Sequence, residues 1–564
     1  MKLILWGYFL LTLSIYALPQ TINNFIKKST IPPKDISIYI KEVGENGRVI
    51  ISHNVTKTRT PASVIKVLST YAAVLKLGFD YHFPTKFYTT GDLRNGVLNG
   101  DIIIKGFGDP TLNSKSLKEI VGNIRARGIQ KITGHIVIDR SYFRVGTKDS
   151  SGFDEHPYSP YNAMPDAMMF NERVSTICVT PNKNDISKKG ADGSYKIINK
   201  LQRVNKPCKG RYSWPGVKID KTKAMPSVLL QGKISQRCGK RNICKVVTKP
   251  YKSFYYALKD KLKEADIIVS GNMRLRKVPQ NAKLLFTHYS RSLEEIISKT
   301  AKKSNNLYAR HLLLLLGAKM YGAPATVSKG RKAVENILRS KDALSHGTLS
   351  IDNGSGLSRT AKLSAKILAD MYDNAYTRYG KRWMQTLSVA GVDGTIKKRF
   401  RGTVVKNRAW MKTGTLRRVK NIGGYVKSKS GKLYTVVILT QSNRGSWRAS
   451  QLQNEIIKWL VTYKGRGGTK PTALHTNDNH LRSMQIGTPN NATFTKYYVQ
   501  AGSFSVQPTK KYLLKLERLG LRYKVKYSDK YKVLIGAYGQ ENDARKALKK
   551  VREHINSGAF IVQL

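Results

Sequence analysis

A length of 564 residues excludes a single hydrophobic core and predicts three or four domains, and a hydrophobic content of 40% is enough for globular domains. Lys and Arg number 100 against 35 Asp and Glu, which gives a formal net charge of +65 and a pI near 10.2. A field of this sign favours an extended anionic partner: nucleic acid, an acidic membrane surface or an anionic cell-wall polymer.

The first residues, MKLILWGYFLLTLSIYALPQ, place Lys2 before an apolar run that ends near Ala17. This pattern predicts a secretory signal peptide over residues 1–17; a retained anchor is the alternative, although the run is short for a membrane span. No later segment is long and apolar enough to cross a bilayer, so we expect no transmembrane segment in the mature chain. Export argues against nucleic acid as the partner of the basic chain.

Residues 35–80 begin with two strand-like segments, DISIYIKEV and RVIISHNV, and end with TRTPASVIKVLSTYAAVLKLG. In the last segment apolar residues recur at helical spacing from Val64 onward, which predicts a core helix ending near Gly78. Ser63 and Lys66 then share one helix face, and a buried lysine can act as the base that a serine nucleophile needs. In so lysine-rich a chain S-x-x-K also arises by chance, so the pair requires further support.

Residues 83–145 are rich in strand and turn signals, and the following region carries all four cysteines, Cys178, Cys208, Cys238 and Cys244. Because exported proteins meet an oxidising compartment, one or two disulfides are predicted within this region, with three pairings possible. Zinc is the competing interpretation. Neither a C-x-x-C pair nor a nearby His supports it, so we expect no metal site.

The next region is predominantly helical. The segment SLEEIISKTAKKSNNLYARHLLLLLGAKMYG predicts two helices, with Ser304-Asn305-Asn306 at the opening of the second. Further helices are predicted around AKLSAKILADMYDNAY and RWMQTLSV. AWMKTGTL, which contains Lys412-Thr413-Gly414, predicts a strand, followed by a hairpin over IGGYVKSKSGKLYTVVILTQS and a closing helix over SQLQNEIIKWLVTY.

The composition changes at residues 464–492, where Gly, Pro, Thr and Asn dominate, which predicts a flexible linker. Residues 493–564 then alternate as strand (KYYVQAGSF), helix (TKKYLLKLERLG), strand (RYKVKYS), strand (KYKVLIGAYG), helix (NDARKALKKVREHI) and strand (AFIVQL). This β-α-β-β-α-β order predicts a ferredoxin-like domain whose two helices cover one face of a four-stranded sheet. The other face is then open to a flat, extended ligand.

Three motifs stand in chain order, S-x-x-K at Ser63, S-x-N at Ser304 and K-T-G at Lys412, each on the expected element. Together they resemble the signature of the penicillin-recognising acyl-serine enzymes. The segments GDIIIKGFGDPTL, IVIDRSYF, MMFNERVSTICVTPN, DNGSGLSR and VAGVDGTIKKRF are similar to those of class C low-molecular-mass penicillin-binding proteins, the D-alanyl-D-alanine carboxypeptidase/endopeptidases. This resemblance covers residues 30–462, and the tail resembles a SPOR domain through YYVQAGSF, YKVLIGAYG and NDARKAL.

The resemblance implies a multidomain α/β and α+β architecture: a penicillin-binding-protein/β-lactamase-like transpeptidase fold with nested mainly-β insert domains, and a ferredoxin-like βαββαβ SPOR domain. The expected parts are a catalytic domain at 28–82 and 285–463, an insert domain at 83–170 and 262–284, a nested cysteine-containing insert at 171–261, and the SPOR domain at 493–564. SPOR domains bind peptidoglycan glycan strands stripped of their stem peptides, so the tail is expected to hold the enzyme at the cell wall.

The resemblance also implies a mechanism. Ser63 would attack the carbonyl carbon of the D-Ala-D-Ala peptide bond and form an acyl-enzyme. Lys66, kept neutral by burial and by the charge of Lys412, would take the Ser63 proton. Ser304 would relay a proton to the leaving amine, and no cofactor is implied.

The remaining motif residues are implied to bind the substrate: Asn306, Lys412, Thr413, Gly414 and Thr415. The asparagine would orient the substrate amide and hydrogen-bond Lys66. The lysine and the two threonines would bind the terminal carboxylate, while the glycine keeps the strand face clear. The backbone N–H groups of Ser63 and Thr415 would form the oxyanion hole.

Two positions depart from the family pattern. Asn305 stands where the motif has Asp, and Arg310 stands where an acidic residue is common, so Arg310 is expected to alter how the pocket edge meets the substrate. Taken alone, Ser304 and Asn306 have a simpler interpretation as an N-cap, which is the usual role of Ser and Asn at a helix start.

The predicted function is a periplasmic, wall-associated serine-type D-Ala-D-Ala carboxypeptidase/endopeptidase. Its expected partners are peptidoglycan stem peptides and glycan strands, with β-lactam antibiotics as covalent inhibitors. A β-lactamase and a non-catalytic peptidoglycan-binding scaffold are the alternatives. The insert domains and the tail argue against the first, and the three intact motifs argue against the second. The choice between carboxypeptidase and endopeptidase remains open.

Overall fold

The computed structural model describes residues 18–563 apart from 45–46, 147, 191, 466–496, 505–506, 520, 522, 528–530 and 539–540. The predicted signal peptide and most of the predicted linker lie outside the described residues. The chain divides into two compact units, Met1–Lys470 and Pro471–Leu564, and each is taken by itself. No helix in the described part of the chain is long and apolar enough to span a membrane.

A six-stranded antiparallel sheet forms the centre of the first unit, in the order β18-β19-β20-β21-β1-β2. Its strands are β1 (Ile36–Glu42), β2 (Val49–His53), β18 (Ser388–Val389), β19 (Ala409–Leu416), β20 (Val419–Lys427) and β21 (Leu433–Gln441). Alternate residues of β21 enter different cores, Val436 and Ile438 on one face and Val437 and Leu439 on the other. Because both faces are covered, β21 reads as a continuous apolar run instead of an alternating one.

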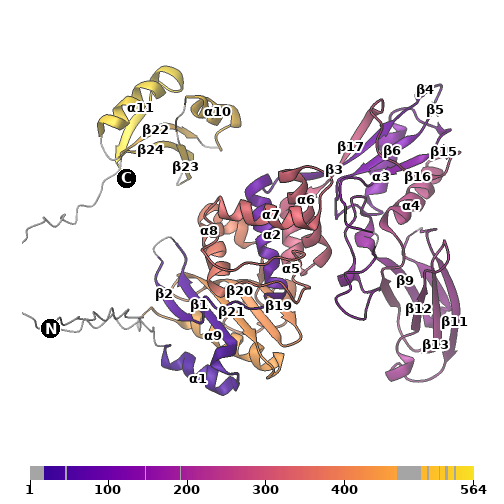
Figure 1. The fold of residues 1–564 in the computed structure, drawn as a ribbon, viewed down its shortest axis with the longest axis horizontal. Helices are drawn as coiled ribbons and strands as arrows, with labels where there is room; N and C mark the ends of the chain where they lie inside the picture. Colours follow the sequence, from indigo (N-terminus) through magenta and orange to yellow (C-terminus); the bar gives the residue numbers. More distant parts are fainter. Residues whose placement is uncertain are drawn as a thin grey trace, which may run out of the picture. The chain divides into compact units, whose positions relative to one another are not determined.

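Helices cover the two faces unequally (Figure 1). On one face lie α1 (Gln20–Ser29) and α9 (Ser446–Thr462), which pack against each other and against the sheet. The other face carries a bundle of five helices: α2 (Lys66–Leu77), α5 (Leu293–Lys302), α6 (Asn306–Tyr321), α7 (Val327–Arg339) and α8 (Ala365–Met384). Gly380 has non-helical backbone angles and divides α8 into two helical segments, so the separate helix predicted around RWMQTLSV is present but ends at Met384, and Ser388–Val389 form β18.

The chain between α2 and α5 builds an insert with its own core. A five-stranded sheet in the order β16-β8-β6-β3-β17 contains β3 (His82–Thr89), β6 (Ile102–Gly106), β8 (Ile136–Asp139), β16 (Met273–Leu275) and β17 (Lys283–Ser292). A four-stranded sheet in the order β15-β7-β5-β4 contains β4 (Asp92–Arg94), β5 (Val97–Asn99), β7 (Lys131–Ile132) and β15 (Ile268–Val269). Helices α3 (Ser116–Arg125) and α4 (Pro250–Glu264) share a hydrophobic core with these sheets.

Two elements cross the predicted domain boundaries. Strand β17 pairs with β3 along most of its length, and Phe286 stacks on Phe87, so residues 285–292 extend the insert sheet and not the catalytic one. Most of α4 was expected in the nested insert, yet Phe254 and Leu258 are buried in the core of the first insert. Both elements follow the nested insert in sequence but pack against parts of the first insert that precede it.

The nested insert consists of two three-stranded sheets around a small core. One sheet has the order β10-β9-β14, with β9 (Ser175–Thr180), β10 (Asp185–Lys188) and β14 (Arg241–Lys245). The other has the order β11-β13-β12, with β11 (Lys196–Val204), β12 (Gly216–Asp220) and β13 (Ser227–Ser235). Cys208 and Cys238 form a disulfide, whereas Cys178 is buried and Cys244 is exposed, each without one.

The second unit confirms the predicted βαββαβ order. Its sheet has the order β23-β24-β22-β25, from β22 (Tyr497–Phe504), β23 (Tyr523–Tyr527), β24 (Tyr531–Tyr538) and β25 (Phe560–Gln563), with helices α10 (Lys510–Arg518) and α11 (Glu541–His554). Tyr497, Phe504 and Tyr538 pack against the core under the helices. Tyr498 lies outside this core and contacts the Lys524 ammonium, 3.9 Å from its ring centre.

Candidate active site

Ser63 lies in the turn that leads into helix α2. Residues Ala62–Ile65 form a short 3₁₀ helix, and α2 begins directly after it at Lys66. Two glycines press on this turn, because a Cβ at Gly414 would lie 3.0 Å from the nitrogen of Ser63, and a Cβ at Gly356 would lie 1.9 Å from the preceding carbonyl oxygen. Glycine at these two positions therefore lets β19 and the Gly356 loop approach Ser63 closely.

Lys66 connects the three parts of the site. Its Nζ lies 2.8 Å from the Oγ of Ser63 and 2.7 Å from the Oδ1 of Asn306, and it also donates to the carbonyl oxygen of Ser355. The side chain is fully buried. The predicted contacts of Lys66 with Ser63 and Asn306 are therefore both present.

The surroundings of Lys66 favour its neutral form. Burial, the largest cause, holds the pKa of Lys66 well below its ordinary 10.5, and the charges of Lys412 and Arg310 lower it further. A neutral amine has two N–H groups and one lone pair. If the N–H groups bind the oxygens of Asn306 and Ser355, the lone pair faces the hydroxyl of Ser63, as a general base must.

Ser304 and Lys412 form a second proton-carrying pair. The Nζ of Lys412 lies 2.9 Å from the Oγ of Ser304 and 2.8 Å from the carbonyl oxygen of Thr413. Lys412 is fully buried, and burial lowers its pKa to about 7. A group with this pKa exchanges protons near neutral pH, which suits the partner of a serine that relays protons.

Asn305 caps helix α6, so Ser304 and Asn306 on either side of it do not have to. It is the N-cap of α6, because its side-chain oxygen accepts from the N–H of Tyr308 at 3.2 Å. Its amide nitrogen donates to the carboxylate of Glu172 at 3.0 Å. An aspartate could make the first contact but would face Glu172 with like charge, so the local structure favours the departure from the family motif. The simpler N-cap interpretation of Ser304 and Asn306 is wrong.

Strand β19 offers an open edge beside the nucleophile. It pairs with β18 only at Trp410 and Met411, so in the described sheet residues 412–416 have no strand on that side. The hydroxyl of Thr413 lies 2.8 Å from that of Thr395. An extended peptide can add to such an edge through main-chain hydrogen bonds.

The model of the D-Ala-D-Ala carboxypeptidase 3 (S13) family matches residues 18–463. The chain belongs to this family. A SPOR domain model matches residues 494–563. The predicted assignment of both regions is therefore confirmed.

Known members of the family resemble the chain over most of their length. D-alanyl-D-alanine carboxypeptidase DacB of Haemophilus influenzae is 26% identical over 447 residues, 76% of this chain and 90% of that protein. D-alanyl-D-alanine carboxypeptidase of Actinomadura sp. (strain R39) is 28% identical over 442 residues, 74% and 80% of the two chains. The crystal structure of penicillin binding protein 4 (dacB) from Haemophilus influenzae aligns with a TM-score of 0.67 at 23% identity, over 78% of this chain and 99% of that one. The predicted penicillin-binding-protein fold is confirmed.

Four contributors to the site were not found in the sequence. They are the carbonyl oxygens of Tyr161 and Ser355, the hydroxyl of Thr395 and the amine of Lys420. The first accepts from the amide nitrogen of Asn306 at 3.0 Å and brings a loop of the insert to the site. A carbonyl carries no side-chain signal. The Thr395 hydroxyl belongs to a glycine-rich loop that meets β19 only in the fold, whereas Lys420 lies on the next strand, β20, directly opposite Thr415.

Arg310 is almost fully buried and also lines the wall of a cavity beside the site, so its expected effect on the pocket edge stays a prediction. Its side chain is 3% exposed, and Nη1 donates to the carbonyl oxygens of Asn162 and Ala163 at 3.3 and 2.6 Å. These carbonyls follow the one that binds Asn306. Burial lowers the pKa of Arg310 to about 10. The arginine therefore holds the insert loop in place and adds positive charge behind Lys66.

A cavity of about 510 Å³ lies between the insert loop and the catalytic domain. Its wall includes Phe153 from the insert, Arg310 from α6, Arg331 from α7 and Arg359 from the loop that follows Gly356. Arg359 stacks over the ring of Phe153 at 4.9 Å. The cavity thus places cationic and apolar groups beside the loop that touches the nucleophile.

Proposed function

We propose that the enzyme forms an acyl-enzyme on Ser63 with a D-Ala carbonyl of peptidoglycan stem peptides. It would hydrolyse the D-Ala-D-Ala bond at free ends and the bond between D-Ala and the amine of a neighbouring stem peptide at cross-links. The observation that carries the proposal is the buried amine of Lys66, 2.8 Å from the Ser63 hydroxyl and held below its ordinary pKa. A serine needs such a base to become a nucleophile, and neither a solvated helix face nor a scaffold requires one.

In the acylation step the oxygen of Ser63 bonds to the substrate carbonyl carbon, and its proton passes to Lys66. The bond to the terminal D-Ala nitrogen breaks, and Ser304 supplies the proton that this amine needs. Lys412 lies 2.9 Å from Ser304 and can replace that proton. Water then attacks the ester and releases the shortened peptide, which restores the Ser63 hydroxyl.

Charge that develops on the carbonyl oxygen is assigned to the backbone N–H groups of Ser63 and Thr415. The close approach of Gly414 to the Ser63 nitrogen supports this assignment, because it brings the two chain segments together. Removing one donor of such a hole costs about 2.7–4 kcal/mol of transition-state stabilisation. Lys412, Thr413 and Thr415 are assigned to the terminal carboxylate, beside the open edge of β19.

The SPOR domain is assigned to glycan strands and keeps the enzyme at the wall. Its match to residues 494–563 and its confirmed topology support this assignment. Outside the helix-covered core, the Lys524 ammonium lies 3.9 Å from the ring centre of Tyr498, which is only 8% exposed, so the lysine is the group of this pair assigned to an extended polar polymer. We place the enzyme in the periplasm, exported by residues 1–17, and the high positive charge attracts it to anionic wall material.

Labelling with a fluorescent penicillin tests the nucleophile. The wild-type chain should acquire a covalent label and Ser63→Ala should not, while both bind isolated sacculi equally. Digestion of purified muropeptides then compares terminal D-Ala release with cleavage of cross-links. Label on Ser63→Ala would contradict the assignment, and rapid turnover of the penicillin would indicate a β-lactamase.

A further inference from the structure

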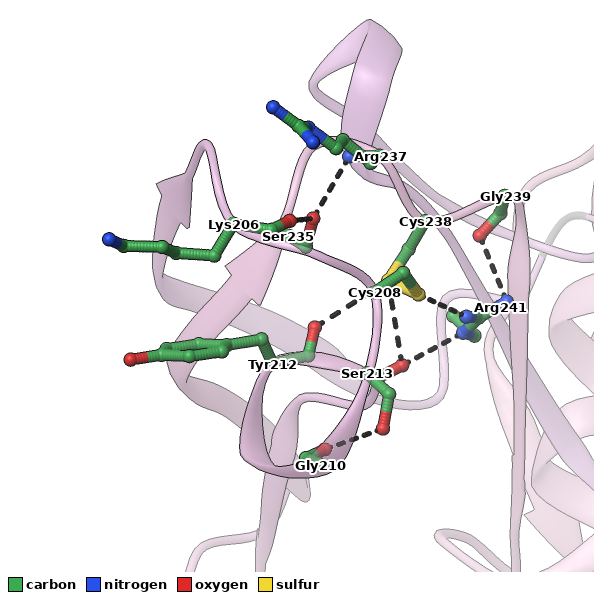
Figure 2. Close-up of a disulfide and its surroundings, with 10 residues drawn as sticks. All are labelled: Lys206, Cys208, Gly210, Tyr212, Ser213, Ser235, Arg237, Cys238, Gly239 and Arg241. Atoms are coloured by element: carbon green, nitrogen blue, oxygen red, sulfur yellow. Dashed lines mark hydrogen bonds between the residues drawn. A yellow bond between two sulfur atoms is a disulfide. The ribbon is translucent and has the colours of Figure 1, made fainter.

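One end of the nested insert is formed by two loops that a disulfide joins. Residues 205–215 connect β11 to β12, residues 236–240 connect β13 to β14, and the Cα atoms of Cys208 and Cys238 are 5.1 Å apart. Figure 2 shows the loops on either side of this bond. Residues 205–215 and 236–241 are called the disulfide tip below.

The disulfide tip is strongly cationic. It contains no Asp or Glu and carries Lys206, Lys209, Arg211, Arg237, Lys240 and Arg241. All of these except the half-buried Arg241 are exposed. Within the described part of the chain none of them forms an ion pair, and their side-chain contacts go to neutral groups, as between Arg237 and the Asn205 side chain at 2.9 Å. These charges are not needed to balance a local carboxylate.

Aromatic side chains are interleaved with the cations. The guanidinium of Arg211 lies 5.0 Å from the ring centre of Tyr212, and that of Arg241 lies 5.3 Å from the ring centre of Trp214. Trp214 is 56% exposed, an unusual exposure for a residue of this size. Figure 2 shows Lys206, Tyr212 and Arg237 pointing outward from the loops, away from the disulfide.

The outer face of the neighbouring sheet continues this surface. Ile198 on β11 is 43% exposed and alternates with Lys196 and Lys200 on the same face of the strand. In the parallel pairing, Lys233 on β13 follows on this face toward the disulfide tip. The exposed Ile198 is therefore surrounded by lysines of β11 and β13.

We infer that the disulfide tip docks the enzyme on the surface of an anionic phospholipid bilayer. Clusters of four to eight Lys and Arg bind anionic headgroups, and exposed Trp and Tyr rings insert at the level of the headgroups. The outward-pointing side chains suit a flat surface, whereas a single polymer strand is better held by a groove. The C-terminal SPOR domain already provides the chain with a polymer-binding module. This inference goes beyond the proposed function, since no tip residue contacts the Ser63 site in the described structure.

Co-sedimentation of the chain from residue 18 onward with lipid vesicles tests the inference. Vesicles containing phosphatidylglycerol are compared with phosphatidylcholine vesicles at one salt concentration. A triple variant, Lys206→Gln, Lys209→Gln and Lys240→Gln, removes three tip charges. We expect it to lower the partition coefficient on phosphatidylglycerol vesicles about a hundredfold, at about fivefold per cation. Trp214→Ala should lower it several-fold without changing the net charge.

A matched triple variant controls for the net charge of the whole chain. Lys115→Gln, Lys118→Gln and Lys131→Gln remove three exposed lysines of the first insert and should reduce vesicle binding much less. Penicillin acylation and sacculus binding should be unchanged in every variant. Equal losses in the two triples, or no effect of Trp214→Ala, would overturn the inference. So would a tip triple that loses sacculus binding but keeps vesicle binding, because the surface would then bind wall polymer.

Discussion

Replacing Lys412 by methionine should make the catalytic domain more stable while it removes activity. The lysine is fully buried, and burial lowers its pKa from 10.5 to about 7. Methionine is of similar length and has no charge to desolvate. We therefore expect the variant to be more stable than wild type at every pH at which Lys412 takes up a proton when the wild-type chain unfolds.

The size of the effect follows from the depressed pKa. A difference between 10.5 and about 7 is about 3.5 units, which corresponds to about 5 kcal/mol at 1.36 kcal/mol per unit. Between these two values the unfolded chain binds more protons than the folded one, so wild-type stability rises with pH across this window. The variant loses two hydrogen bonds, to Ser304 and Thr413, at about 1 kcal/mol each. Lys412→Met should thus be about 3 kcal/mol more stable at about pH 6.5, and this advantage should disappear by about pH 9.5.

Urea unfolding followed by tryptophan fluorescence measures this difference, because Trp383, Trp410, Trp447 and Trp459 all lie in the catalytic domain. The free energy of unfolding is compared between wild type and Lys412→Met from pH 6 to pH 9.5. Thr413→Val is the matched control, since it alters the same strand without touching the amine. A stability gap that does not change with pH, or a variant less stable than wild type at the lowest pH, would refute the reasoning.

Three further predictions concern the surroundings of the nucleophile. Arg310→Met removes a charge that lowers the pKa of Lys66, so this pKa should rise and the acid limb of the pH profile of acylation should shift to higher pH. Arg331→Met is the control and should leave the acid limb unchanged. Identical profiles for wild type and Arg310→Met would contradict the effect of Arg310 on Lys66. Gly356→Ala should slow penicillin acylation about a hundredfold or more, because its Cβ would displace the turn before the nucleophile; an unchanged rate at intact circular dichroism would count against the contact. Asn305→Asp places a carboxylate against Glu172 and should cost about 1–3 kcal/mol in urea unfolding, whereas Asn305→Ser keeps the helix cap and should cost less.

The side chains that we propose to be catalytic could be found in the sequence because their spacing is local. Ser63 and Lys66 are one helical turn apart, and Lys412 stands in an alternating strand, so each motif implies its own geometry. The contact between Lys66 and Asn306 needed the family resemblance, because 240 positions separate them. The carbonyl oxygen of Ser355 could not be predicted, since every residue has one and only the fold selects which is used.

The burial of Arg310 and the extent of the insert could not be predicted for a related reason. Arg310 is a polar residue in the leucine-rich helix α6, which is buried on all sides over residues 307–318. The apolar pattern of such a helix does not distinguish a buried face from an exposed one, so it could not predict where Arg310 lies. Strand β17 follows the nested insert but pairs with β3, far earlier in the chain. Local patterns predict that such a strand exists, whereas its partner depends on the tertiary structure.

The pairing of β1 with β21 makes the proposed active site depend on contacts between distant parts of the chain. Ser63 follows β1 closely, but its pairing strand, Leu433–Gln441, comes about 350 residues after the insert begins at residue 83. The insert can condense around its own core first, and the catalytic sheet must wait for late, non-local contacts. A chain that is still being synthesised or translocated is therefore expected to carry Ser63 without β19, the strand that lies beside it in the fold. We therefore expect Ser63 to remain unreactive until nearly the whole catalytic region is present, which would prevent premature hydrolysis without a separate inhibitor.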